Sequence, residues 1–380
     1  MSTVLPPLGL YVHLPWCIRK CPYCDFNSYE KKDALPERDY VDALLRDLDA
    51  ELPLVSGREL TSIFIGGGTP SLFSGSAIAA LLDGIRARSA TSPEIEITLE
   101  ANPGAAEAAR FAEFRAAGVN RLSVGVQSLR EPQLRALGRV HGPDEAIAAV
   151  TAAGAAGFTN VNVDLMYGIP GDQPAASVDD LERALALEPA HLSWYQLTLE
   201  PNTHFERHPP ALPEEDTIMA IEAAGRHLLA RSGFERYEVS AYARPGFRCR
   251  HNLNYWEFGD YLGIGSGAHG KLTVGSGAIE RRAKTRNPKT YLATAGTAAA
   301  ASIERIDVPE ALVTEFLMNA LRLVDGVDDD LIRIRTGQGS DRVQAGVEKA
   351  RHRGWLMSEP GRLRATRDGM QSLNRLLALF

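Results

Sequence analysis

Three of the four cysteines of this chain fall within eight residues, at Cys17, Cys21 and Cys24. Their spacing is C-x3-C-x2-C, and it follows an apolar, β-branched stretch, residues 9–13, that predicts a strand. Thiolates are soft ligands that suit iron–sulfur clusters, zinc or copper(I). Three crowded cysteines make a poor disulfide framework, so their spacing indicates a metal centre.

A [4Fe–4S] cluster usually takes four cysteine ligands, so three local cysteines would leave one iron without a protein ligand. An open iron can chelate a small molecule through an amine and a carboxylate, and the methionine end of S-adenosylmethionine (SAM) offers both. Iron–sulfur potentials reach about −700 mV, low enough to cleave a C–S bond of SAM and release a 5′-deoxyadenosyl radical. The motif therefore favours a [4Fe–4S] cluster that binds SAM.

Two simpler interpretations compete with the cluster. Zinc could use the three cysteines together with His13 or Cys249 as a fourth ligand. The segment Cys21-Pro-Tyr-Cys24 also matches a C-x-x-C redox pair. The redox interpretation ignores Cys17 and the repeated β–α pattern around the motif, so we expect the cluster.

Short apolar, β-branched runs alternate with amphipathic stretches along the first half of the chain. Strands are predicted over 9–13, 62–65, 94–99, 120–126, 160–166 and 191–199, and helices over 39–54, 75–88, 106–117, 143–156 and 177–187. Repeated β–α units imply a buried parallel sheet. The pattern alone does not separate an open doubly wound sheet from a partial (β/α) barrel.

Polar and glycine residues recur where these strands are predicted to end. Gly66-Gly67-Gly68-Thr69-Pro70 closes the second strand and lacks the Gly-Lys-Ser/Thr of a P-loop. Consecutive glycines allow a close backbone approach, here to the methionine amine of SAM, although a tight turn without a ligand explains them too. Glu100 and Gln127 end the next two strands, Asp164 lies late in the fifth, and Arg139 follows in a helix or loop. Ligands of parallel β/α folds gather at such strand ends.

A second chemical cluster is Cys249-Arg-His-Asn-Leu-Asn-Tyr-Trp256. His251 could ligate haem iron, with Tyr255 and Trp256 against the porphyrin, or could be a hydrogen-bonded histidine at a turn. Cys249 could be a haem ligand, a distant cluster ligand or an inert buried thiol, and we expect the last. Residues 265–270 match G-x-G-x-x-G, but no helix or βαβ unit surrounds them, so a dinucleotide site is rejected.

The composition of the chain limits the class of protein and its cellular location. The chain has 380 residues and a net charge of −7, and this acidic balance argues against a general nucleic-acid binder. It contains neither an apolar run of about 18 residues nor a signal-peptide pattern, so we expect a cytoplasmic protein without a transmembrane segment.

The last eighty residues differ in pattern from the rest. Residues 296–303 look like a connector, helices are predicted over 309–322, 341–352 and 367–379, and 355–357 with 362–365 predict a hairpin. We expect a core over 1–300 that includes the segment around His251, and a small helical, winged-helix-like domain over 301–380 that packs or docks.

Together the motifs resemble a known family. Leu10–Cys17, the cysteine motif, Gly66–Pro70 and Glu100-Ala-Asn-Pro are similar to the oxygen-independent coproporphyrinogen III oxidase group of radical SAM proteins. That oxidase has a fourth cysteine where this chain has Phe26, which puts porphyrinogen decarboxylation in doubt. The chain resembles more closely the haem-chaperone branch of the group, whose haem-binding motif is similar to the stretch that starts at His251.

The resemblance implies a partial (β/α)6 radical SAM barrel with [4Fe–4S], SAM and haem as cofactors. It assigns the cluster to the three cysteines and cluster-bound SAM to Tyr11, Gly67 and Glu100. Positions that contact a second SAM in the oxidase correspond to Gly68, Thr69, Gln127, Arg139 and Asp164, and the haem ligand to His251.

The expected activity is haem delivery to acceptor haemoproteins such as respiratory enzymes, with an electron donor as a further partner and no residue assigned to catalysis. The alternative is radical decarboxylation of coproporphyrinogen III to protoporphyrinogen IX.

Overall fold

Six consecutive β–α strands run parallel through the middle of the main sheet. They are β1 (Leu8–Leu14), β4 (Leu60–Gly67), β5 (Thr91–Ala101), β6 (Arg121–Gln127), β7 (Val161–Tyr167) and β8 (His191–Gln196). The structure, a computed structural model, describes residues 5–55, 57–275 and 278–380. All six predicted strands are present, so the predicted repeat is confirmed.

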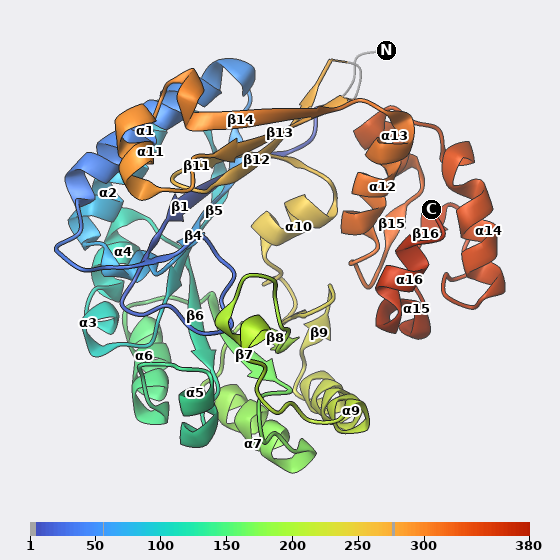
Figure 1. The fold of residues 1–380 in the computed structure, drawn as a ribbon, viewed down its shortest axis with the longest axis horizontal. Coiled ribbons are helices and arrows are strands. Elements are labelled where there is room, and N and C mark those ends of the chain that lie inside the picture. Colours follow the sequence, from blue (N-terminus) through green and yellow to red (C-terminus); the bar gives the residue numbers. More distant parts are fainter. Residues whose placement is uncertain (1–4, 56, 276–277) are drawn as a thin grey trace.

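Helices lie along the outer side of the curved sheet (Figure 1). They are α1 (Glu37–Glu51), α2 (Gly75–Arg86), α3 (Ala105–Ala108), α4 (Phe111–Ala117), α5 (Glu131–Ala136), α6 (Pro143–Ala155), α7 (Pro174–Leu185) and α9 (Glu215–Arg231). The strand order runs from β14 at one edge to β9 at the other without closing. The fold is therefore an open, partial barrel, as the resemblance implied.

Alternation along β1 explains how this sheet presents two different faces. Leu10, Val12 and Leu14 belong to the main hydrophobic core. Because successive side chains of a strand point to opposite faces, Tyr11 and His13 project to the inner side of the barrel. Apolar side chains thus pack against the outer helices, while the inner face of the sheet can carry polar side chains that bind a ligand.

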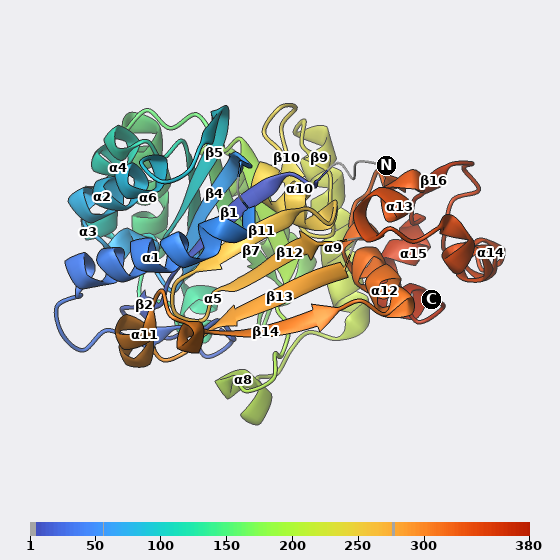
Figure 2. The same ribbon diagram turned by 90° about the horizontal axis from the view of Figure 1, so that it is seen from above.

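An antiparallel extension continues the sheet beyond β1. Strand β11 (Asp260–Ile264) pairs in parallel with β1, and β12 (His269–Val274), β13 (Ala278–Lys284) and β14 (Ala301–Ile306) follow in antiparallel order. Figure 2 shows these strands side by side, running toward the C-terminal helices. The expected connector over 296–303 is wrong at its end, because residues 301–303 begin β14. As an edge strand with mostly exposed side chains, β14 has no buried alternation to reveal it.

The opposite edge and the inner side carry shorter elements. These are β9 (Glu235–Arg236), β10 (Ala241–Ala243), α8 (His204–Arg207), α10 (Arg250–Trp256) and α11 (Pro288–Thr294). Short 3-10 helices cover Leu52–Val55, Pro70–Leu72, Ala298–Ala300 and Ser340–Val343. Figure 1 shows α10 on the inner side of the curved sheet, so the stretch that contains His251 is a helix.

The C-terminal part is mainly helical, with a small β wing. It contains α12 (Pro309–Ala320), α13 (Asp330–Thr336), α14 (Gln344–His352), α15 (Arg367–Gln371), α16 (Leu373–Leu377), β15 (Val327–Asp328) and β16 (Arg362–Leu363). The predicted hairpin forms one bridge, between Leu356 and Ala365, while β16 pairs with β15. The predicted final helix is divided at Ser372 into two.

The C-terminal helices share a hydrophobic core with the sheet. Phe258, after α10, and Ile279, on β13, are buried with residues of α12 such as Phe316. The rings of Phe258 and Phe316 meet edge to face at 5.8 Å. Strand β14 lies past the expected boundary at residue 300 and still pairs with β13. In the described ranges, no helix is long and apolar enough to cross a membrane.

Candidate functional site

A cavity of about 370 Å3 opens on the inner side of the barrel, where the cysteine loop meets the ends of the parallel strands. We call it the cysteine cavity. Its walls include all three predicted cluster ligands and seven of the nine predicted cofactor-binding residues: Cys17, Cys21, Cys24, Gly67, Gly68, Thr69, Glu100, Gln127, Arg139 and Asp164. Residues spread over almost 150 positions therefore meet at one site, as expected for parallel strand ends.

The cysteine loop is held by a short parallel pair of strands. Cys17 ends β2 (Trp16–Cys17), which pairs with β3 (Tyr29–Glu30). Cys17 is buried, while Cys21 and Cys24 are half-buried and face the cavity. Burial raises the pKa of the Cys17 and Cys24 thiols, and the Arg139 guanidinium lies 3.4 Å from the Sγ atom of Cys21. This contact ties the cysteine loop to Arg139, which follows α5.

The donor arrangement fits a cluster better than a single zinc ion. Among the described residues, no three His, Cys, Asp or Glu side chains stand close enough to hold one metal ion. His13 uses both ring nitrogens, at 2.8 Å from the Tyr11 hydroxyl and 2.8 Å from the Asn27 carbonyl. The Sγ atom of Cys249 lies 3.5 Å from Glu96, away from the cavity lining. Neither proposed fourth zinc ligand is available, whereas a cube can bind each thiolate on a different iron.

The glycine run after β4 is required by close packing. Gly67 has φ of 116°, and a Cβ atom there would lie 2.7 Å from the His13 ring. A Cβ atom on Gly68 would lie 2.5 Å from the Trp16 carbonyl oxygen. The Gly67 amide donates a hydrogen bond of 3.1 Å to a carboxyl oxygen of Glu100. Larger residues would push the glycine run away from the cysteine loop.

Two carboxyl groups share the inside of this cavity. Burial, reinforced by the nearby Asp164, raises the pKa of Glu100 from its usual 4.5 to about 8. Burial also raises the pKa of Asp164, although hydrogen bonds from Asn162, Ser193 and Ser123 oppose the shift. A cationic ligand would favour the ionised forms of both groups. SAM carries positive charge on its sulfonium and its amine, so the carboxyl pair suits it.

Arg139 and Gln127 connect the strand ends to the cysteine loop. One Arg139 nitrogen donates to the Asn102 side chain and to the Gly125 carbonyl, each at 2.7 Å. Asn102 in turn donates to the Thr69 hydroxyl at 2.8 Å. Gln127 has φ of 68°, unusual for a residue with a side chain, and accepts a 2.8 Å hydrogen bond from the Tyr195 hydroxyl. Such strain at a strand end is typical of a binding site.

The cavity also contains polar residues that the sequence reasoning missed. They come from the inner faces of β6, β7 and β8: Arg121, Ser123, Asn162, Ser193 and Tyr195. Arg121 is only 2% exposed, and its Nε atom has no hydrogen-bond partner among the described residues. The sequence does contain a pattern that could have indicated them, because polar residues occupy every second position of a strand and so share one face. Arg121 with Ser123 and Asn162 with Asp164 are examples.

Tyr11 and His251 lie outside the cavity lining. The Tyr11 ring stacks on Phe64, a wall residue, at 6.3 Å. His251 is 1% exposed, stacks on the same Phe64 at 5.1 Å, and bonds through Nδ1 to Ser62 at 2.8 Å and through Nε2 to Tyr255 at 2.7 Å. Burial lowers its pKa to about 3, so the ring is neutral. Neither nitrogen is free, and iron ligation by His251 requires one of these bonds to break.

Known proteins are similar to this chain over almost its whole length. The heme chaperone HemW of Escherichia coli is 48% identical over 376 residues, which cover 99% of this chain and 98% of that protein. The heme chaperone HemW of Haemophilus influenzae is 46% identical over 380 residues, with 99% and 98% covered. The chain belongs to the HemW family. The closer likeness to the chaperone branch than to the oxidase is thereby confirmed.

Family models and a solved structure agree with the HemW assignment. The radical SAM superfamily model matches residues 11–184, and the model of the HemN C-terminal domain matches residues 308–371. The structure of coproporphyrinogen III oxidase (HemN) from Escherichia coli, a radical SAM enzyme, aligns with a TM-score of 0.83 at 22% identity and covers 100% of this chain and 91% of that one. The fold is thus the radical SAM fold of HemN with its C-terminal domain.

Proposed function

We propose that this HemW-family chain binds haem as cargo and delivers it to acceptor haemoproteins such as respiratory enzymes. Full-length identity of 48% to a heme chaperone carries the proposal. Haem is the cargo, whereas a [4Fe–4S] cluster and SAM are the resident groups expected of a radical SAM protein. The cluster and SAM would control haem binding or assembly and would not drive a decarboxylation.

The residues of the cysteine cavity would hold the resident groups. Cys17, Cys21 and Cys24 would ligate the cluster, and Glu100 with the Gly67 backbone would bind the cationic methionine end of SAM. When bound, the cluster supplies one low-potential electron to SAM. Arg139 would hold the cysteine loop in place through its contacts with Cys21 and Asn102. An external electron donor completes the set of partners.

The oxidase activity is the second candidate, because one observation favours it. The residues that match second-SAM positions of the oxidase (Gly68, Thr69, Gln127, Arg139 and Asp164) line the same cavity as the cysteines. Against it stands Phe26, which is 59% exposed at the position of the oxidase's fourth cysteine. We therefore rank haem delivery first.

One anaerobic reaction separates these two candidates. Reconstituted protein is mixed with SAM, a low-potential reductant and coproporphyrinogen III, and mass spectrometry measures 5′-deoxyadenosine and decarboxylated porphyrinogen in the same sample. Haem delivery predicts no decarboxylated product, with or without 5′-deoxyadenosine. Protoporphyrinogen IX formed over several turnovers would make the chain an oxidase.

Two finer assignments belong to the same proposal. Ligation of haem by His251 needs the hydrogen bond to Ser62 or Tyr255 to open, so it would accompany a movement of α10. We also propose the division into a core over 1–300 and a helical domain over 301–380, with β14 as the strand that connects them.

A further inference from the structure

Phe64 lies between the cysteine cavity and the histidine of α10. It shares the inner face of β4 with Ser62 and Gly66, because every second residue of a strand points the same way. Its half-buried ring lines the cysteine cavity. The same ring stacks on His251 at 5.1 Å, with an angle of 28° between the ring planes. Of the described residues that line the cavity, Phe64 alone has a ring contact with His251.

On the cavity side, Phe64 packs against residues that the resemblance assigns to SAM. The ring of Tyr11 stacks on it at 6.3 Å. A Cβ atom on Gly66 would lie 3.0 Å from Cε1 of Phe64 and 2.9 Å from a carboxyl oxygen of Glu100, so the ring and the carboxyl group both close over this glycine. The same carboxyl oxygen accepts the hydrogen bond from the Gly67 amide. A ligand held by Glu100 and Gly67 would therefore lie next to the Phe64 ring.

On the other side, α10 is held against three strands of the sheet. Glu96 of β5 accepts hydrogen bonds of 3.1 Å each from the backbone amides of Arg250 and His251. Gly9 of β1 leaves room for the imidazole, because a Cβ atom there would lie 3.3 Å from the His251 ring. Ser62 of β4 bonds to Nδ1. These contacts enclose the imidazole, so it can reach an iron atom only if α10 moves away from the sheet.

Other residues of α10 also lie beside the SAM positions. Asn252 is part of the lining of the cysteine cavity. Burial raises the pKa of the Tyr255 hydroxyl, and the neighbouring Tyr261, Tyr11 and Glu100 raise it further. Because electrostatic interactions weaken with distance, Tyr255 lies near both Tyr11 and Glu100. The helix and the SAM positions are therefore neighbours, although they are more than one hundred residues apart in the sequence.

The half-buried position of Phe64 determines how its ring can move. Because the cavity lies beside it, the ring can turn toward the cavity as His251 leaves the sheet. A ligand in the cavity would occupy that space and keep the ring against the imidazole. The closed position of α10 would then be favoured by the packing of an aromatic pair at 5.1 Å, within the usual range for such pairs.

We infer that Phe64 is a positioning residue that couples the two sites: with SAM in the cysteine cavity, its ring is held against His251, and α10 stays closed over the haem ligand. The inference rests on the proposed function, because that proposal assigns SAM to the cavity and haem to His251. It also gives the control by SAM a sign, since SAM should weaken haem binding. Binding free energies are linked, so haem should weaken SAM binding by the same factor.

Haem titration with and without SAM tests this coupling. The reconstituted wild type is compared with Phe64→Leu, with Phe64→Tyr and with Phe114→Leu, which changes a fully buried phenylalanine of α4 outside the cavity lining. No reductant is added, so SAM stays intact. We expect SAM to weaken the haem affinity of the wild type by roughly fivefold or more. Phe64→Leu should show almost no effect of SAM, whereas Phe64→Tyr, which keeps the ring, and Phe114→Leu should keep the wild-type ratio.

Hydrogen exchange provides a second measurement that needs no haem. SAM alone should slow amide exchange over α10, Arg250–Trp256, in the wild type and in Phe64→Tyr, but not in Phe64→Leu. Equal slowing in the wild type and Phe64→Leu, or none in the wild type, would overturn the inference and leave haem delivery standing. An equal effect of SAM on the haem affinity of these two proteins would overturn it too. A wild type that binds no haem would instead overturn the proposed function, and the exchange data would still decide whether Phe64 links the cavity to α10.

Discussion

The cluster assignment makes a prediction for each cysteine. Cys17→Ser, Cys21→Ser or Cys24→Ser should each lose most of the roughly four iron and four sulfide ions per chain expected of a [4Fe–4S] cluster after anaerobic reconstitution. Cys249→Ser is the matched control, because that thiol lies against Glu96 and outside the cavity lining. Iron and acid-labile sulfide analysis measures the effect. Equal loss in Cys249→Ser, or none in the other three variants, would refute the ligand set.

Glu100 gives a pH-dependent prediction. Its pKa in the folded chain is raised from 4.5 to about 8, so the folded state keeps a proton that the unfolded state loses in this window. The contribution of Glu100 to the free energy of unfolding should therefore fall as the pH rises from about 5 to about 8, and the difference between the wild type and Glu100→Gln isolates it. Without SAM, Glu100→Gln should gain about 1–2 kcal/mol relative to the wild type over that range, by urea denaturation. Glu304→Gln, at an exposed position of β14, should show no such trend.

Functional residues could be predicted from the sequence where the side-chain type itself indicates a chemical role. The cysteines, the glycine run, Glu100, Gln127, Arg139 and Asp164 were all predicted and lie on one cavity. His251 was also selected by type, but Ser62 and Phe64 come from a different strand, and no local pattern shows that they enclose its ring. Burial of a histidine depends on the tertiary fold.

Among the elements, the parallel strands were easier to predict than the antiparallel ones. Each parallel strand is bounded by turns and carries apolar residues on the face that packs against the helices, as do Leu122, Val124 and Val126 of β6. Strand β13 instead contains Glu280, Arg281, Arg282 and Lys284, a run of charges that looks exposed. Lys284 is nevertheless buried, because two acidic residues of α1 compensate it. The partners lie over two hundred residues away, beyond any local pattern.

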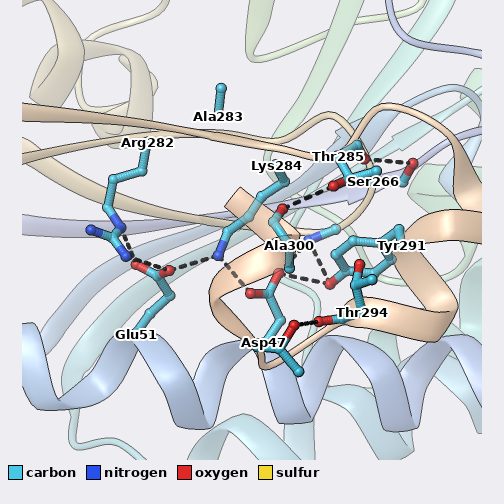
Figure 3. Close-up of polar contacts among 12 residues, drawn as sticks. Asp47, Glu51, Ser266, Arg282, Ala283, Lys284, Thr285, Tyr291, Thr294 and Ala300 are labelled. Atoms are coloured by element: carbon cyan, nitrogen blue, oxygen red, sulfur yellow. Dashed lines mark hydrogen bonds and ion pairs between the residues drawn. The ribbon is translucent and has the colours of Figure 1, made fainter. Parts of the chain in front are cut away.

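That ion cluster joins α1 to β13 and makes a prediction at the scale of elements (Figure 3). Lys284→Met would leave Asp47 and Glu51 buried without their cation, and should lower the free energy of unfolding by about 3–5 kcal/mol. Lys289→Met, at an exposed position of α11, should change stability little. Chemical denaturation measures both variants. A Lys284→Met chain as stable as Lys289→Met would show that the cluster does not hold the sheet extension.

For the molecule as a whole, the central sheet bears cavities at two different places. The cysteine cavity lies at the ends of the parallel strands, and a second cavity, which includes His269 and Ala283, lies against the antiparallel extension. The C-terminal helices share their core with Phe258 and Ile279, so they are continuous with that extension.

A transfer assay gives the most direct test of haem delivery. The reconstituted protein is loaded with haem and mixed anaerobically with SAM and the apo form of a respiratory haemoprotein, and the absorption spectrum of the acceptor reports the haem it receives. We expect the acceptor to fill faster from the loaded wild type than from free haem or from a non-specific haem carrier, and we expect Cys21→Ser to slow the transfer. Filling no faster than from free haem would contradict haem delivery.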